Sequence, residues 1–381
     1  MKKPYNLNWI RNIEIQRRAT DWASKKLLEE PQLKTIKAEF QAHFYRPNFF
    51  VKIGLFLFAL IGSAFFMGFV FLFLTDSNIT DRGFAMISLL FAGFFIFFLE
   101  RQIKLSKLFH SGVDNALLYV SITLIFVPVF LLFNNLKIWQ YALFLFIPLS
   151  IATIRYADIL TAASSFLALF VTLGNFLMNF SGGTLILPFA VMLMAACIYF
   201  AVRNNTSIYY ANCRKIIEIL SLAVFYLGGN YLIVREGNAL LTHQASSVSR
   251  QIPFAPVFYL FTIVIPFSYI LMGVRKKDRI LLNTGLLATA FSVVTFGHYF
   301  SPFTAAQNIF ISGLALILFS AALIRYLHKP KHGISDEPEK RNVPDELKSI
   351  LIAQTLGQDP ETKGINFGGG NFGGGGAGEV Y

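Results

Sequence analysis

The sequence predicts an all-α, polytopic integral membrane protein with about ten transmembrane helices and both termini in the cytoplasm. Of its 381 residues, 55% are hydrophobic and 14% are charged, a balance outside that of soluble domains. The apolar residues gather into blocks of roughly 17 to 25 residues, the length that lets a helix cross a bilayer. These blocks lack the alternation of a transmembrane strand, and a helix pairs its own backbone groups inside lipid.

Residues 1–50 precede the first block and form a polar, basic leader. Apolar residues recur there at three- or four-residue spacing, which predicts two amphipathic helices between residues 8 and 44, divided at Pro31. The apolar positions are Trp9, Ile10, Ile13, Trp22, Leu27 and Leu28, then Leu33, Ile36, Phe40 and Phe44. We expect this hairpin to lie among the lipid headgroups, with a protein-docking surface as the alternative. The leader has no signal-peptide pattern, so the first transmembrane helix is expected to direct targeting.

Residues 51–327 make up the predicted transmembrane bundle. Its ten blocks are 51–74, 83–99, 116–133, 138–154, 159–177, 185–202, 216–234, 254–274, 280–296 and 305–326.

Lys and Arg in the short loops predict the orientation. One side carries eleven: Arg101, Lys104, Lys107, Arg155, Arg203, Arg214, Lys215, Arg275, Lys276, Lys277 and Arg279. The other side carries four: Arg82, Lys137, Arg235 and Arg250. The first side is therefore predicted to be cytoplasmic, and an even number of crossings places both termini there. The net charge of +12 then reflects topology and attraction to membrane lipids, not nucleic-acid binding.

The ten blocks also permit a division into five plus five, which would make the halves inverted repeats as in several transporter folds. Pro128 and Pro266 then fall at matching depth in the third helix of each half. A proline in mid-helix frees a carbonyl group and kinks the helix, and paired interrupted helices indicate a central binding site. Pro148 has no counterpart in the ninth block, so the pattern depends on this one pair.

Neutral polar residues inside the blocks are the other candidates for a substrate site. Asn230 follows Gly228 and Gly229, and adjacent glycines weaken a helix and let a ligand or a neighbouring helix approach the backbone. Asn175, Ser268, Asn283 and Thr284 also lie in apolar blocks. Such residues either line a cavity or form hydrogen bonds between helices, and the second use is the more common.

Ionisable residues within the blocks are few, and structural roles account for them. Glu218 lies one turn inside the seventh block near Arg214 and Lys215, where it is a weak candidate for substrate binding and fits an interfacial carboxylate. Asp158 is placed to cap the helix of the fifth block. Cys197 and Cys213 are too few for a disulfide framework or a zinc site, so no metal or cofactor is predicted.

The C-terminal region turns polar after the tenth block. Residues 328–363 form a linker rich in proline and charge, and "PDELKSILIAQTLGQ" within it predicts one short amphipathic helix. Residues 364–381, "GINFGGGNFGGGGAGEVY", are too rich in glycine to bury a core and are predicted to be disordered. No helix or Walker Lys follows the glycines, so they do not form a phosphate loop. Phe367, Phe372 and Tyr381 are candidate anchors for a partner protein.

This tail resembles the Gly-Phe-rich C-termini, ending in an aromatic residue, of uncharacterised bacterial multi-spanning membrane proteins. The resemblance covers about fifteen residues and implies no activity. Together with the high Phe content, it suggests a bacterial inner membrane.

Two functions remain open. The sequence favours a non-catalytic membrane protein whose cytoplasmic termini contact lipids or an unidentified protein. The alternative is a secondary transporter or channel for a neutral or lipid-like molecule, because no charge at mid-depth is available to bind an ion. An enzyme is the least supported class, since catalytic motifs are absent and the one sizeable polar loop on the outer side, residues 235–251, has only Glu236 as a carboxylate.

Overall fold

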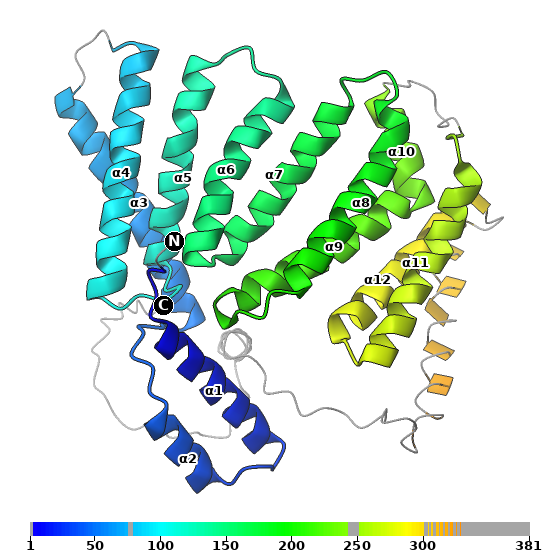
Figure 1. Ribbon diagram of the computed structural model, residues 1–381, viewed down its shortest axis with the longest axis horizontal. Coiled ribbons are helices and arrows are strands. Elements are labelled where there is room, and N and C mark those ends of the chain that lie inside the picture. Colours follow the sequence, from blue (N-terminus) through cyan, green and yellow to red (C-terminus); the bar gives the residue numbers. More distant parts are fainter. Residues whose placement is uncertain are drawn as a thin grey trace, which may run out of the picture.

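The computed structural model describes residues 3–74, 79–242 and 251–300, together with scattered positions between 304 and 328. Within these residues it contains twelve α-helices and one short 3₁₀ turn, so the predicted all-α class is confirmed. Helices α3 to α12 lie side by side in a curved row, and α1 and α2 lie below it (Figure 1).

The leader forms α1 (Leu7–Ser24) and α2 (Glu30–Glu39), as predicted, but the division between them was misplaced. The side chain of Asn6 caps α1 by accepting hydrogen bonds from the backbone of Asn8 and Trp9. Pro31 lies in the first turn of α2. Backbone N–H groups in the first turn of a helix have no partner within the helix, so a proline there costs no hydrogen bond. Pro31 therefore belongs to the start of the second helix and does not separate the two helices.

The first five helices of the bundle match the first five predicted blocks. They are α3 (Phe49–Leu74), α4 (Asp81–Leu105), α5 (Val113–Leu132), α6 (Ile138–Tyr156) and α7 (Ile159–Leu177). Asp158 caps α7 as predicted, because its side chain accepts a hydrogen bond of 2.9 Å from the backbone N–H of Thr161.

The second part of the bundle contains a helix break at Asn230, where one continuous helix was predicted. Its elements are α8 (Gly183–Arg203), η1 (Ile208–Tyr210), α9 (Ala211–Gly229), α10 (Tyr231–Leu241), α11 (Ala255–Lys276) and α12 (Arg279–Phe300). The seventh predicted block was wrong as one continuous helix, because α9 ends at Gly229 and α10 leaves at an angle of 75°. Residues 235–241, expected in a loop, belong to α10.

Eight helices are long and apolar enough to cross a bilayer, namely α3 to α8, α11 and α12, and the bent segment 208–241 is a ninth candidate. The chain is therefore a polytopic membrane protein. Half of the residues of the tenth predicted block, 305–326, are described, and these are helical. At its start, Thr304 and Gln307 cap each other: each backbone N–H donates to the other's side-chain oxygen, at 3.0 Å and 3.4 Å.

The helices pack as hairpins around two larger cores, and a smaller third cluster lies around Tyr231 and Phe258. The pairs α4/α5, α6/α7, α8/α9 and α11/α12 make the most extensive contacts. One core includes Leu99, Leu117 and Ala162 from α4, α5 and α7, whereas the other joins Met192 of α8 to Ile265 of α11. An inverted relation between two halves stays a prediction, since only half of the residues of the tenth block are described.

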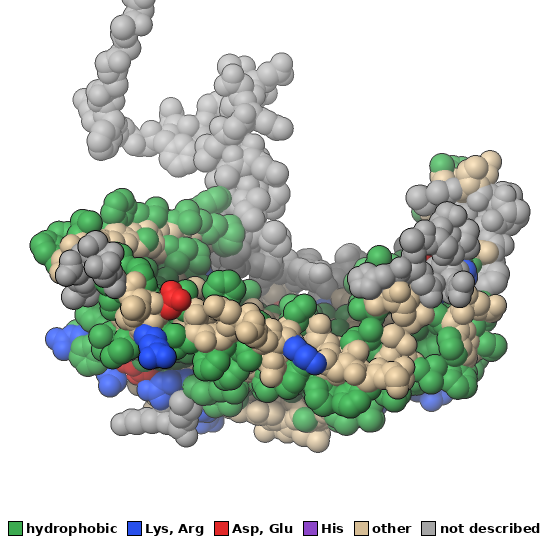
Figure 2. Space-filling model, turned by 90° about the horizontal axis from the view of Figure 1, so that it is seen from above, with side chains coloured by type: hydrophobic (Ala, Val, Ile, Leu, Met, Phe, Trp, Pro, Cys, Tyr) green, Lys and Arg blue, Asp and Glu red, His purple; other side chains and the backbone are tan. Residues whose placement is uncertain are grey.

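Large apolar side chains cover much of the surface of the bundle. In the view of Figure 2 the described residues form a shallow crescent on which hydrophobic side chains predominate. Phe58, Phe65 and Leu72 of α3 are each exposed by 75% or more. Such a surface is suited to contact with lipid chains.

Four turns between helices meet at the end of the bundle that carries the leader, which we call the leader end. The turn after α4 contacts the leader, because the N–H of Tyr45 donates to the carbonyl of Lys107. Asn115 and Asp158 join the turns before α5 and α7, and Arg203 and Asp278 join those after α8 and α11. The eleven basic residues of the predicted cytoplasmic side thus lie at one end of the molecule. Each is in a loop at the leader end or within two helical turns of such a loop.

Candidate functional site

The break between α9 and α10 is the first candidate site, because transmembrane helices are interrupted mainly where they line a cavity or bury the free backbone groups. Asn230 occupies the break and is fully buried. Its Oδ1 accepts hydrogen bonds from the backbone N–H groups of Leu232 at 3.0 Å and Ile233 at 3.3 Å. Asn230 is therefore the N-cap of α10.

Side chains from α11 and α12 hold the break in place. Nδ2 of Asn230 donates to the hydroxyls of Tyr226 and Thr295, at 2.9 Å and 3.0 Å. The backbone N–H of Tyr231 donates to Oγ1 of Thr262 at 3.0 Å, and Ser292 donates to the carbonyl of Thr262 at 2.7 Å. Donors freed by the break are thus paired inside the protein, as an apolar environment requires.

The two glycines before the break allow close approach to two different neighbours. A Cβ atom added at Gly228 would lie 3.0 Å from Met192 and 3.3 Å from the carbonyl oxygen of Pro188, both in α8. A Cβ at Gly229 would lie 2.7 Å from the side chain of Ile265 in α11. Pro188 is five residues from the start of α8, so the break lies roughly 8 Å along that helix from the end opposite the leader.

A cavity of about 330 Å³ lies beside the break, between α7, α8, α9 and α10. It is partly open to the surroundings. Its walls include Phe170 of α7, Val224 and Gly228 of α9, and Gly237 of α10. Thr184 and Asn238 are its two polar lining residues among those described, and none of its described lining residues is charged. The volume falls in the range of sites for small molecules.

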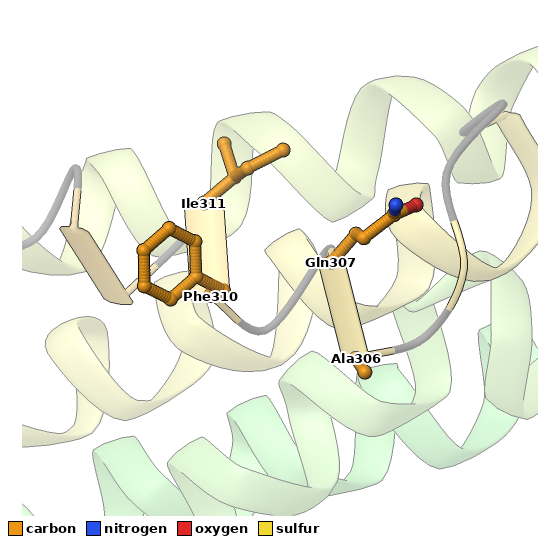
Figure 3. A pocket seen from close by; sticks show the side chains of 4 residues that line it. All are labelled: Ala306, Gln307, Phe310 and Ile311. Carbon is orange, nitrogen blue, oxygen red and sulfur yellow. The ribbon is translucent and has the colours of Figure 1, made fainter.

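A second hollow, of about 370 Å³, is less convincing. Figure 3 shows its described lining residues, Ala306, Gln307, Phe310 and Ile311, which come from one helical segment. All four are exposed, and the side chains of Gln307 and Phe310 point away from each other. A binding site is enclosed by several elements, whereas the described walls of this hollow come from one.

The structure brings together only part of the predicted substrate site. Gly228, Gly229 and Asn230 form the break, and Pro266 of α11 follows Ile265, the residue that Gly229 contacts. Pro128 belongs to α5, which packs on α3, α4 and α6 and not beside the break. Glu218 lies near the leader end of α9, where its carboxylate is 3.8 Å from the guanidinium of Arg214.

Three residues of the hydrogen-bond network around the break were missed in the sequence. Ser268, Asn283 and Thr284 were considered, whereas Thr262, Ser292 and Thr295 make the contacts. Ser292 and Thr295 are three residues apart on one face of α12, which is the signal that could have identified them. Thr262, alone in an apolar stretch, gave no comparable signal.

A second polar cluster, also missed, joins the leader to the bundle at the leader end. Asp114 is 2% exposed and accepts hydrogen bonds from the hydroxyl of Tyr5, the backbone N–H groups of His110 and Ser111, and the hydroxyl of Ser111. Asp158, 4% exposed, accepts from Asn115 at 2.7 Å and from Tyr119 at 3.0 Å. Because every carboxylate oxygen has a donor, this cluster satisfies buried charge and fits a structural role.

The described residues contain no group of three or more His, Cys, Asp or Glu side chains that could hold a metal ion. Cys213, expected in a loop, is instead buried in α9 and donates to the carbonyl of Asp158 at 3.4 Å. Cys197 is exposed on α8. Phe367, Phe372 and Tyr381 lie outside the described residues.

Comparisons with known proteins add no further identification. No family model matches the chain, and no curated protein or solved structure is similar to it.

Proposed function

We propose that this polytopic membrane protein is a secondary transporter or channel for a neutral or lipid-like small molecule, which binds in the cavity beside the α9–α10 break. The observation that carries the proposal is the coincidence of a broken helix, a buried capping network and a cavity at one place. Broken helices lie beside the substrate site in several transporter folds. The sequence alone favours interacting termini, and the cavity shifts the preference to transport.

The chemistry of the cavity supports an uncharged substrate. Its described walls are apolar except for Thr184 and Asn238, and an ion would lose its hydration without gaining a counter-charge. The hydrogen bonds of Asn230 are already made to protein groups, so its role is to fix the break and not to bind the substrate.

Filling the cavity tests this proposal. A Cβ atom at Gly237, a lining residue, would meet nothing within 4 Å, so Gly237→Leu places a side chain in the cavity without a clash at Cβ. Gly93→Leu is the matched control, because Gly93 is exposed in α4 with equally open space. Native mass spectrometry of protein released gently from its own membrane reports any small molecule that is retained.

We expect wild type and Gly93→Leu to retain the same bound mass and Gly237→Leu to lose it. Equal retention by all three proteins, or retention by none, would reject the cavity as the binding site. Thermal unfolding of both variants shows whether either substitution has disturbed the fold.

The leader supports a second candidate function, contact with the membrane surface or a partner protein. Leu7, Arg11, Arg18 and Trp22 follow helical spacing along one exposed face of α1. Basic and aromatic residues in this arrangement attract anionic headgroups. Hydrogen exchange in α1 should be slower in nanodiscs with anionic lipid than in zwitterionic nanodiscs, and Arg11→Gln with Arg18→Gln should remove that difference.

The same proposal includes the orientation and location of the chain. The basic turns gather at the leader end, which supports placing this end and both termini in the cytoplasm. The high Phe content and the Gly-Phe-rich tail favour a bacterial inner membrane. Removal of residues 329–381, which include Phe367, Phe372 and Tyr381, tests whether the tail binds a partner: a co-purifying protein should be lost.

A further inference from the structure

The two polar residues of the cavity lie toward one end of it. Thr184 is the second residue of α8, and α8 begins at the end of the bundle opposite the leader. Asn238 lies in the last turn of α10, which ends at Leu241. Phe170 and Val224, in contrast, lie well inside α7 and α9. The cavity therefore has a polar end toward the opposite face and an apolar end deeper in the bundle.

Both polar side chains are available to a ligand. Within the described residues, the hydroxyl of Thr184 and the carboxamide of Asn238 have no hydrogen-bond partner, although the backbone carbonyl of Asn238 accepts a bond from Thr242. Each is half-buried. A hydroxyl and a carboxamide together offer donors and acceptors but no charge.

We infer that the substrate is an amphiphile with one hydrocarbon chain and an uncharged, hydrogen-bonding head group, such as an alcohol, amide or glycerol ester. Its head group contacts Thr184 and Asn238, and its chain extends toward Phe170 and Val224. This inference depends on the proposed function, since it names the substrate class of the same cavity.

Charge and hydrogen bonding together favour a neutral polar head group. An ionised carboxylate, phosphate or ammonium at this position would have no opposite charge on the described walls of the cavity and would bind poorly. A plain hydrocarbon is also disfavoured, because it would leave the polar groups of Thr184 and Asn238 unpaired beside an apolar chain. A neutral head group satisfies both conditions.

The probe is a 12-carbon monoacylglycerol with a diazirine at the end of its chain, added to the full-length protein in phosphatidylcholine nanodiscs. Photolysis followed by peptide mass spectrometry locates the label. We expect labelling around Phe170 and Val224, and a second probe with the diazirine in its head group should label near Thr184 and Asn238. Equal labelling of the same residues by both probes would overturn the orientation.

Competition tests the head group. Unlabelled monododecanoylglycerol should displace the probe at a concentration at least ten-fold lower than dodecanoate or dodecyltrimethylammonium. The variant carrying Thr184→Val and Asn238→Leu should lose this preference while it still binds the probe through its chain. If the three competitors act equally on wild type, the inference is wrong.

Gly237→Leu separates this inference from the proposed function. If it abolishes labelling but charged and neutral competitors are equivalent, the cavity stands and only the substrate class is overturned. If labelling persists at wild-type level in Gly237→Leu, both are overturned. The Gly93→Leu variant should be labelled by both probes like wild type, which would show that a leucine introduced on another helix does not affect labelling.

Discussion

The hydroxyl of Tyr5 donates a hydrogen bond of 2.9 Å to Oδ2 of Asp114, a residue 109 positions further along the chain. Tyr5 precedes α1 and is 4% exposed, and Asp114 lies in the first turn of α5. The Tyr5 ring also packs edge-on against Phe109. The leader is thereby fixed to the bundle at its base, while the far ends of α1 and α2 extend away from the bundle (Figure 1).

Tyr5→Phe should loosen the leader without unfolding the bundle. It removes a hydrogen bond to a buried carboxylate, and bonds to charged groups contribute about 1.5–3 kcal/mol. A loss of about 1.4 kcal/mol corresponds to a tenfold change in an equilibrium constant, so the undocked leader should be at least ten times more populated. Trypsin cleavage at Arg11, which requires the docked start of α1 to unfold, should accelerate accordingly.

Tyr45→Phe is the control, because Tyr45 is 46% exposed and also belongs to the leader, in the segment after α2. It should be cleaved at the wild-type rate. If Tyr5→Phe is also cleaved at that rate, the bond to Asp114 does not hold the leader.

Acidification should weaken the same attachment. Burial lowers the pKa of His110 below its usual value of 6.5, with Lys52 acting in the same direction and Asp114 and Asp158 opposing it. The undocked state, with His110 exposed to water, therefore binds more protons than the docked state as the pH falls through 6.5. Docking should be constant above about pH 7.5 and should weaken progressively below 6.5. Tyr5 stays neutral in this range, because burial and Asp114 raise its pKa well above 10.

Fluorescence of Trp9 can follow this change, since its ring packs against Phe44 and lies under the ammonium group of Lys107. The other tryptophans are replaced by Phe, and His43, which also contacts Trp9, by Asn. His110→Asn should then abolish the response between pH 5 and 7.5. Asn suits the position because His110 has a φ of 49°, a left-handed conformation that Asn tolerates. An unchanged pH response in His110→Asn would contradict this assignment.

Replacing Asn230 should destabilise the second core. Asn230→Leu removes the cap of α10 and leaves the hydroxyls of Tyr226 and Thr295 without their amide partner. Loss of a cap costs about 1 kcal/mol, and each lost hydrogen bond to Tyr226 and Thr295 costs about 0.5–1.5 kcal/mol more. A lowered thermal unfolding midpoint in detergent should report this loss.

Asn175→Leu provides the comparison, because among the described residues the side-chain amide of Asn175 bonds only the carbonyl of Val171, in its own helix. It should change the unfolding free energy by less than about 0.5 kcal/mol. Similar midpoints for the two variants would show that the network around Asn230 contributes little.

The sequence is sufficient to predict features that depend on neighbouring residues. Helix length and apolar composition located eight of the blocks, and helical spacing identified the two-helix leader. Ser111 and Asp114 have the spacing of a capping motif before an apolar run, so part of the leader-end cluster could also have been found. That Tyr5 reaches Asp114 could not, because the contact depends on how distant segments pack.

The same limit applies at the break. The glycine pair and Asn230 indicated a point of low helix propensity. Helix propensity alone, however, does not decide whether the helix bends there or crosses the membrane straight. The 75° turn depends on Thr262 and Thr295, which accept the freed N–H of Tyr231 and the amide of Asn230. The cavity combines residues from four helices, and no local pattern connects Phe170 with Gly237.

Gly273→Ala should destabilise the α11/α12 hairpin, whereas Gly237→Ala should not. A Cβ atom at Gly273 would lie 2.7 Å from the backbone nitrogen of Leu282, and one at Gly285 would lie 2.9 Å from that of Ile270. The two backbones therefore touch, and extra volume between them costs about 1–3 kcal/mol. At Gly237, where space is open, alanine should raise stability by up to about 1 kcal/mol through its helix propensity. Thermal midpoints that shift in opposite directions would confirm the contact, and equal midpoints would mean that the helices can separate at no cost.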